Sequence, residues 1–66
     1  NGLLRRTLQA WFRHNVQPLA TSKALFIHRN TLEYRLNRIS ELTGLDLGNF
    51  DDRLLLYVAL QLDEQR

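Results

Sequence analysis

The chain has 66 residues, of which 44% are hydrophobic, and a formal net charge of +2. This length allows one domain with a single small core, and the composition is that of a folded protein. Because cysteine is absent, disulfide bridges and thiolate metal sites are excluded. No apolar run approaches the ~20 residues of a membrane span and the start is not signal-like, so we expect a cytoplasmic protein. The sequence does not begin with Met, and we expect it to be part of a longer chain.

The charge is distributed unevenly along the sequence. Residues 1–38 contain seven Lys/Arg and one acid, Glu33, whereas residues 39–66 contain six acids and two arginines. The first segment therefore carries +6 and the second −4. Such polarity orients a domain toward a polyanion, although ordinary solvated faces also explain the charges taken alone.

The spacing of apolar residues predicts four helices, an all-α single domain over residues 1–66. The first helix covers about residues 3–14 and stops near Asn15. Its inner face is formed by Leu4, Leu8, Trp11 and Phe12. The second helix begins at Pro18, because proline suits the first helical position. Its inner face is formed by Leu19, Ser22 and Leu25 with Phe26, and Ile27 fills the turn.

The third helix is predicted over about residues 28–42, and Gly44 terminates it. Its inner stripe is Leu32, Leu36, Ile39 and Leu42. Two residues are candidates for the N-cap: Asn30, because Asn30-x-x-Glu33 resembles a capping box, and His28. The register of the turn favours His28, since Ile27 is then the turn residue and Leu32 the first core residue.

The fourth helix is capped by Asn49 or Asp51 and reaches about Leu62. It is apolar nearly all round, so the spacing of its apolar residues does not determine which face is buried. We expect the core to be sealed by Leu55, Val58, Ala59 and Leu62. We expect Leu56 and Leu60 to be exposed and to contact a second copy or another part of the protein.

The second and third helices, about residues 18–43, are typical of a helix-turn-helix unit that binds double-stranded DNA. The outward side of the third helix carries Asn30, Thr31 and Tyr34, with Arg29 at its edge. These four are our candidates for base contacts, since Asn suits adenine, Thr a thymine methyl and Arg guanine or a phosphate. Our candidates for phosphate contacts are Lys23, His28, Arg35 and Arg38, together with Gln17.

Glu33 is out of place beside a polyanion. Three explanations remain open: it accepts from cytosine, it rejects wrong sequences, or it supports the helix cap.

Other functions are less well supported. No cysteine or carboxylate cluster accompanies His14 and His28, so we expect no metal site and no cofactor. No nucleophile–base pair or glycine-rich phosphate loop indicates an enzyme. We expect the following aromatic residues in the core rather than in a base-stacking platform for RNA: Trp11, Phe12, Phe26 and Phe50. The main alternative is a helix-turn-helix used for protein interaction or dimerisation, without direct DNA contact, through the apolar fourth helix.

A longer motif carries a family resemblance. It comprises Leu4-x-x-Thr7-Leu8, residues 21–25, Phe26-Ile27-His28-Arg29-Asn30-Thr31-Leu32 and Tyr34-Arg35-Leu36, followed by Leu42-Thr43-Gly44-Leu45-Asp46, Asp52-Arg53-Leu54 and Ala59-Leu60. Over nearly the whole chain it resembles the C-terminal helix-turn-helix of the PucR/CdaR group of bacterial transcription regulators. It is also similar to the Fis and NtrC-type DNA-binding domains.

The resemblance implies a Fis-like fold and DNA-contact roles for His28, Arg29, Asn30, Thr31, Tyr34 and Arg35. Within the group the likeness is to regulators of carbohydrate diacids. It therefore implies an activator of genes for the uptake and catabolism of sugar diacids such as glucarate, galactarate or glycerate. It also implies a sensor domain N-terminal to this segment, and we expect a homodimer or higher oligomer in the full protein.

Overall fold

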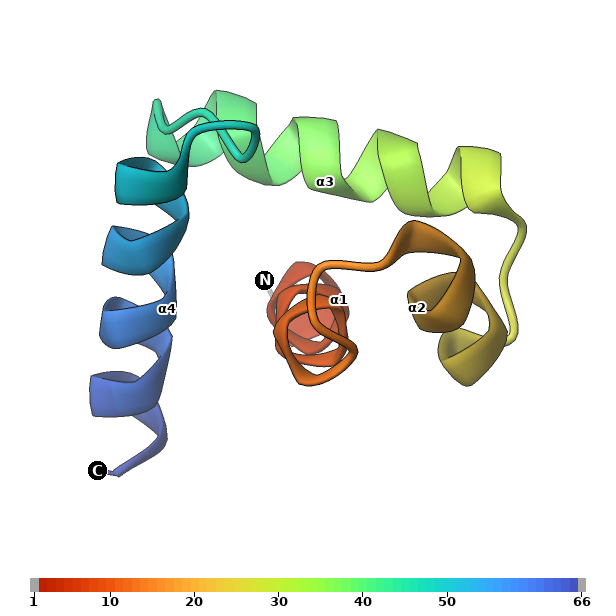
Figure 1. Ribbon diagram of the computed structural model, residues 1–66, viewed down its shortest axis with the longest axis horizontal. Helices are drawn as coiled ribbons and strands as arrows, with labels where there is room; N and C mark the ends of the chain where they lie inside the picture. The colour runs from red at the N-terminus through yellow and green to blue at the C-terminus, as the bar shows by residue number, and fades with distance from the viewer. Residues whose placement is uncertain (1, 66) are drawn as a thin grey trace.

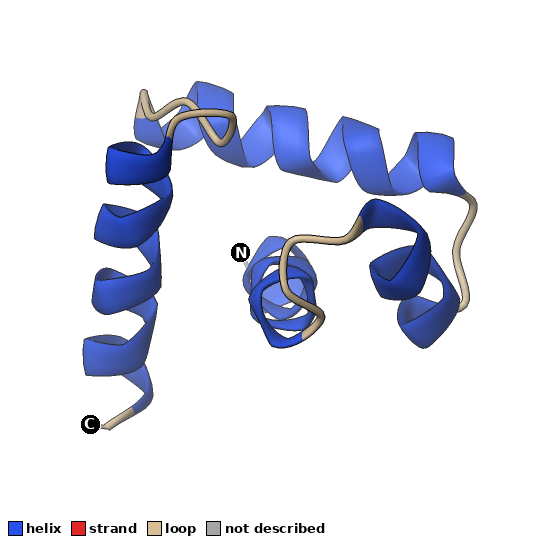
Figure 2. Cartoon of the chain, in the orientation of Figure 1, coloured by secondary structure: helices blue, strands red, loops and turns tan. Residues whose placement is uncertain are grey.

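Residues 2–65 of the computed structural model are described, and within them the regular structure is helical (Figure 2). The helices are α1 (Gly2–Arg13), α2 (Pro18–Leu25), α3 (Arg29–Thr43) and α4 (Phe50–Glu64). In Figure 1, α1 is seen end-on below α3, α2 lies beside it under the start of α3, and α4 descends from the other end of α3. The predicted all-α class is confirmed. No helix in the described part of the chain is long and apolar enough to cross a membrane.

The apolar core joins α1, α3 and α4. Its buried residues are Leu8, Trp11, Ile39, Leu56 and Leu60. The helices α1, α2 and α3 also pack against one another in pairs. Two buried threonines, Thr7 and Thr21, satisfy their hydroxyl groups by donating to the carbonyl four residues earlier, at 2.9 and 2.7 Å. Buried hydroxyls are tolerated in this small core because each donates its hydrogen to a nearby backbone carbonyl.

The helix ends follow the local chemistry of the chain. Gly44 ends α3 with φ +73°, a conformation that costs glycine little. The Asn49 side chain accepts the backbone N–H of Asp52 at 3.1 Å, so Asn49 rather than Asp51 is the cap of α4. After α1, Asn15 and Val16 adopt left-handed conformations with φ +57° and +64°. The predicted stop near Asn15 and the predicted start of α2 at Pro18 agree with these positions.

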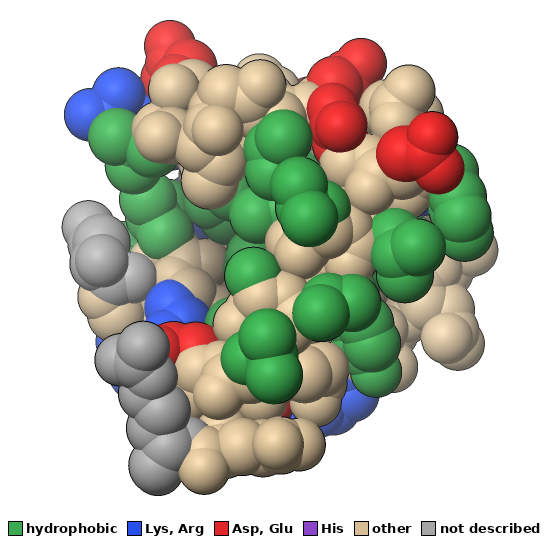
Figure 3. Space-filling model, turned by 90° about the vertical axis from the view of Figure 1, so that its left-hand side faces the viewer, with side chains coloured by type: hydrophobic (Ala, Val, Ile, Leu, Met, Phe, Trp, Pro, Cys, Tyr) green, Lys and Arg blue, Asp and Glu red, His purple; other side chains and the backbone are tan. Residues whose placement is uncertain are grey.

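The predicted inner face of α4 is wrong. Leu56 and Leu60 are each only 8% exposed and lie in the core, whereas Leu55, Val58 and Leu62 are 59%, 46% and 63% exposed. Since α4 is apolar on most sides, its own periodicity does not select the buried face. The observed orientation of α4 also allows polar contacts with α1: Arg5 pairs with Asp63, and Gln9 donates a hydrogen bond to Glu64. In Figure 3, which looks onto the side of the molecule that carries α4, hydrophobic side chains are spread over the visible surface.

Several other residues predicted to be inside are exposed: Leu19, Phe26, Leu42 and Phe50. Leu42 and Phe50 belong to the terminal turns of α3 and α4, and they are 60% and 67% exposed. Phe26 is 95% exposed because the chain leaves α2 there in a left-handed conformation, φ +57°, and does not continue the inner face of the helix. In the second helix the buried residues are Thr21 and Ser22.

Candidate nucleic-acid interface

The outward face of α3 carries the residues predicted to contact bases. Asn30, Thr31 and Tyr34 are exposed, with Tyr34 at 69%, while Leu32 and Ile39 on the other side are 0% and 5% exposed. At 1.5 Å per residue, the 15 residues of α3 make a rod of roughly 22 Å. A single helix of this kind fits the major groove of B-DNA, which is about 12 Å wide. The geometry thus gives α3 a free polar face of suitable size, and α3 is called the recognition helix below.

The recognition helix begins with a side-chain cap. The His28 Nδ1 atom accepts the backbone N–H of Asn30 at 3.0 Å, and the His28 carbonyl accepts the N–H of Leu32 at 3.1 Å. This confirms the sequence preference for His28 as the cap. The capping box starting at Asn30 does not form, because Asn30 is already in the first helical turn. Its side chain is consequently available on the surface.

The three arginines of the recognition helix have different environments. Arg29 is exposed and forms no side-chain hydrogen bond or ion pair among the described residues. The Arg38 Nη1 lies 3.4 Å from Glu41 Oε1, in a pair whose side chains are 49% and 68% exposed. Arg35 is half-buried, and its Nη1 donates to the Thr7 hydroxyl on α1 at 3.5 Å. Their contributions to anion binding should therefore differ.

The predicted backbone contacts on α2 lie at its two ends. Gln17 is the N-cap, but its side chain makes no capping hydrogen bond. Its carbonyl accepts both the N–H and the hydroxyl of Thr21, at 3.0 and 2.7 Å. Lys23 is exposed in the last turn and has no ion-pair partner in residues 2–65. Both side chains are available to a partner, at opposite ends of a short helix.

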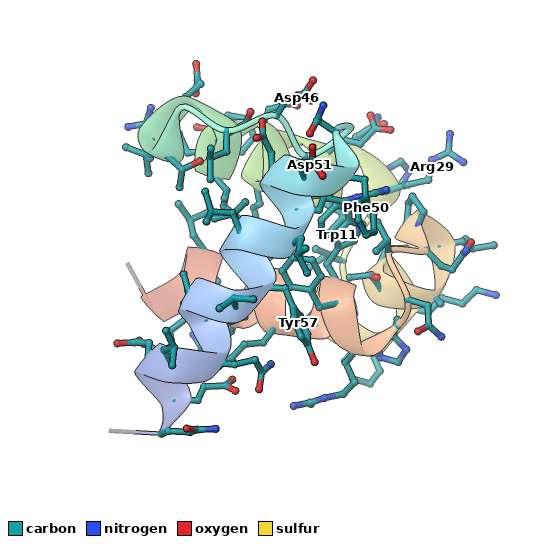
Figure 4. All side chains as sticks on the ribbon, turned by 60° about the vertical axis from the view of Figure 1, so that its left-hand side comes forward. Trp11, Arg29, Asp46, Phe50, Asp51 and Tyr57 are labelled. Atoms are coloured by element: carbon teal, nitrogen blue, oxygen red, sulfur yellow. The ribbon has the colours of Figure 1, made fainter. Side chains whose placement is uncertain are left out.

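Acidic side chains lie away from the start of the recognition helix, although two ion pairs, Arg5–Asp63 and Arg38–Glu41, join opposite charges elsewhere. The view in Figure 4 places Arg29 at the start of the recognition helix, away from Asp46 and Asp51 near the connection to α4. Two acids, Glu33 and Glu41, are exposed on the recognition helix itself, and Glu33 is the one nearer its start. Glu33 lines a groove of about 440 Å³ with Trp11, Asn37 and other residues. Because His28 caps the helix, the explanation of Glu33 as part of a capping box is wrong, and the other two remain.

Two features of this region were not predicted from the sequence. Thr7 is 1% exposed and contacts Arg35, although the spacing of apolar residues gave it no place in the core. Phe26, expected in the core, is exposed in the turn directly before the recognition helix. Polar residues with internal hydrogen bonds and apolar residues in turns give no periodic signal, so neither position could be found from spacing.

The described residues contain no group of three or more His, Cys, Asp or Glu arranged to hold a metal ion. The predicted contact residues Leu56 and Leu60 are not at the surface and are replaced there by Leu55, Val58 and Leu62. The site therefore consists of one exposed polar and basic helix with a short helix beside it.

Comparison with known proteins identifies this arrangement. Residues 4–62 match the model of the PucR C-terminal helix-turn-helix domain. The whole chain is 97% identical to part of the carbohydrate diacid regulator of Escherichia coli strain K12, of which it spans 17%. Over 96% of its length it is 38% identical to the proline-responsive transcriptional activator PutR of Bacillus subtilis, spanning 15% of that protein. Over 89% it is 42% identical to the transcriptional activator PmfR of Paenarthrobacter nicotinovorans, spanning 13%.

The chain thus spans less than a fifth of the length of these relatives. No solved structure matches it. The family match covers nearly all of the four helices and includes both halves of the helix-turn-helix. The chain belongs to the family of PucR C-terminal helix-turn-helix domains.

Proposed function

We propose that this domain binds double-stranded DNA by placing the recognition helix in the major groove. The observation that carries the proposal is the exposed face of that helix, with Asn30, Thr31 and Tyr34 outward and Arg29 free at its start. Asn and Arg make the bidentate contacts that distinguish adenine and guanine. The four-helix unit then acts as the DNA-binding output domain of a bacterial transcriptional activator, working in the cytoplasm.

The backbone contacts in this proposal come from residues at the flanks of the recognition helix. Arg35 and Arg38 lie along it, His28 lies at its cap, and Lys23 lies on α2. Lys and Arg neutralise phosphates and release counterions, so binding should weaken steeply as salt rises. The nearly identical relative is a carbohydrate diacid regulator, which supports a role in controlling sugar-diacid uptake and catabolism genes through an N-terminal sensor domain.

A direct test is to titrate the domain into a fluorescent duplex at salt concentrations between about 50 and 200 mM. We expect a nonspecific Kd on the order of 10⁻⁴–10⁻⁶ M at physiological salt. A variant with Arg29, Arg35 and Arg38 changed to Ala should bind far more weakly, with the log–log salt slope smaller by about 2–3.

The matched control removes the same charge elsewhere, by changing Arg6, Arg13 and Arg53 to Ala. These arginines lie on α1 and α4 rather than on the recognition helix. We expect the control to retain most of the affinity. Equal losses in the two variants would mean that only net charge matters, and no binding by the folded wild type would reject the proposal.

A second candidate function is self-association, which the outer face of α4 favours. Leu55, Val58 and Leu62 follow one another at helical spacing and are all exposed. A dimer of the full protein would present two recognition helices to half-sites about 34 Å apart. Sedimentation of the domain with and without Leu55→Ser and Leu62→Ser tests it, because a dimer through this face should dissociate in the variant.

A further inference from the structure

The buried hydroxyl of Thr7 links α1 to the recognition helix. Thr7 is 1% exposed. Its Oγ1 donates to the Leu3 carbonyl at 2.9 Å and accepts from Arg35 Nη1 at 3.5 Å. A hydroxyl has one hydrogen and two lone pairs, so it makes both bonds at once. The hydroxyl hydrogen of Thr7 is thus used within α1. Toward the recognition helix, the hydroxyl oxygen acts as a hydrogen-bond acceptor.

Arg35 is hydrogen-bonded to a neutral partner, so its positive charge is not compensated by that contact. Its guanidinium has five N–H donors, and the contact with Thr7 uses one of them. Arg35 also lines a groove of about 430 Å³ beside the outward face of the recognition helix, together with Tyr34, Arg38 and the start of α1. The side chain is half-buried, so its motion is restricted before any ligand binds. An arginine ordered in advance loses less conformational entropy when it binds an anion.

The other arginines of the recognition helix lack this combination. Arg29 is exposed and has no side-chain partner among the described residues, so no such contact orients its guanidinium. Arg38 is paired with Glu41, and that carboxylate competes with a phosphate. Thr7 is neutral and fixes Arg35 without such competition.

We propose that Thr7 is a positioning residue for DNA binding, whose hydroxyl orients the Arg35 guanidinium toward a backbone phosphate. This rests on the proposed function, in which the recognition helix lies in the groove and Arg35 contacts the backbone. Thr7 itself touches no DNA, because it is buried between helices.

The test is a double-mutant cycle on Thr7 and Arg35. Thr7→Val removes the hydroxyl and keeps the shape, Thr7→Ser keeps the hydroxyl, and Arg35→Ala removes the guanidinium. The Kd for a duplex of arbitrary sequence is measured for each single variant and for the double Val/Ala variant as a function of salt. We expect Thr7→Val to weaken binding about threefold to tenfold, the effect of one lost hydrogen bond, and Thr7→Ser to restore it. The double variant should bind no more weakly than Arg35→Ala alone.

A matched control separates positioning from stability. Thr21 is a second buried threonine, 0% exposed, whose hydroxyl donates to a carbonyl of its own segment. Thr21→Val should lower the Tm as Thr7→Val does but leave the Kd and the salt slope unchanged, with all variants measured well below their Tm. A purely structural role for Thr7 would make the two threonine variants behave alike, which would overturn the proposal.

The remaining outcomes are also decisive. Thr7→Val binding like the wild type, while Arg35→Ala binds weakly, would show that Arg35 needs no positioning and would leave the proposed function intact. Additive losses in the cycle would show that the two residues act independently, with the same consequence. Absence of DNA binding by the folded wild type would instead reject the proposed function itself.

Discussion

The imidazole of His28 forms a hydrogen bond with the backbone N–H of Asn30, a group that has no hydrogen-bond partner within the helix. The Nδ1 atom of His28 accepts the N–H of Asn30 at 3.0 Å. The first N–H groups of a helix have no partner within it, so a side-chain acceptor stabilises the start of the helix. The same bond fixes where the recognition helix begins, and thus where Asn30 lies on its surface.

Loss of this cap should be measurable as a loss of stability. We expect His28→Ala to lower the free energy of unfolding by ~1 kcal/mol, and His28→Ser to recover most of it because serine also caps helices. Urea unfolding followed by the fluorescence of Trp11 measures this, since Trp11 is the single tryptophan and is 5% exposed. Equal stability of the Ala and Ser variants would mean that the cap contributes nothing.

Base discrimination should depend on the outward residues near the start of the recognition helix. We expect Asn30→Ala or Tyr34→Ala to lose ~1–3 kcal/mol of preference between sequences while the fold remains. Selection of duplexes from a random pool, with wild type and variants, measures this preference position by position. Asn37→Ala is the control, because Asn37 is exposed two turns further along the same helix. An unchanged selected sequence in the Asn30 and Tyr34 variants would remove them as base contacts.

The ion pair of Arg38 should make its contribution smaller than that of Arg29. Arg29→Ala should lower the salt slope by about 1. Arg38→Ala should lower it less, because Glu41 at 3.4 Å already compensates part of the charge. Glu41→Gln should strengthen binding by about twofold to threefold, since the exposed pair is worth ~0.2–1 kcal/mol. Weaker binding of Glu41→Gln would show that Glu41 helps to orient Arg38 rather than to compete with DNA.

The parts of the fold that the sequence predicts are those decided by local chemistry. His28, Gly44 and Pro18 act on the backbone within one turn of their own position, and their roles were found correctly. The outward face of the recognition helix was also correct, because its polar residues stand opposite a regular apolar stripe. Only Leu42, at the end of that stripe, is exposed instead of buried.

The parts that could not be predicted depend on tertiary partners. Leu56 and Leu60 are buried and Leu55 is exposed because of where α1 lies, which no property of α4 reveals. The contact between Thr7 and Arg35 joins residues 28 positions apart. Its two members are a small polar residue and a charged one, and spacing rules place neither type inside.

The turn before the recognition helix stores strain at Phe26. A non-glycine residue in the left-handed region costs roughly 1–2 kcal/mol, and Phe26 has φ +57° while its side chain is 95% exposed. A glycine at this position lowers the free energy of unfolding by ~0.5–1 kcal/mol, because it gives the unfolded chain more conformational freedom. We therefore expect Phe26→Gly to be neutral or to stabilise the domain by up to ~1 kcal/mol. Urea unfolding measures it, with Phe26→Ala as the control that removes the ring and keeps the strain. If Phe26→Gly destabilised the domain and Phe26→Ala did not, the conformation of residue 26 would not be strained.

The buried face of α4 can be tested by comparing leucines that differ only in exposure. Leu56 and Leu60 are 8% exposed, so truncation to Ala removes packed volume from the core and should cost ~2–5 kcal/mol. Leu55 and Leu62 are 59% and 63% exposed, and the same change there should stay within about 0.5 kcal/mol. A domain of this size is stable by only a few kcal/mol, so the loss in Leu56→Ala or Leu60→Ala is large enough to unfold it even in the absence of denaturant.

The variants Leu56→Met and Leu60→Met keep the comparison measurable in that case. They keep the side-chain volume and should cost less than ~1.5 kcal/mol. Larger losses at Leu55 and Leu62 than at Leu56 and Leu60 would restore the face predicted from the sequence and would contradict the packing of α4 on α1.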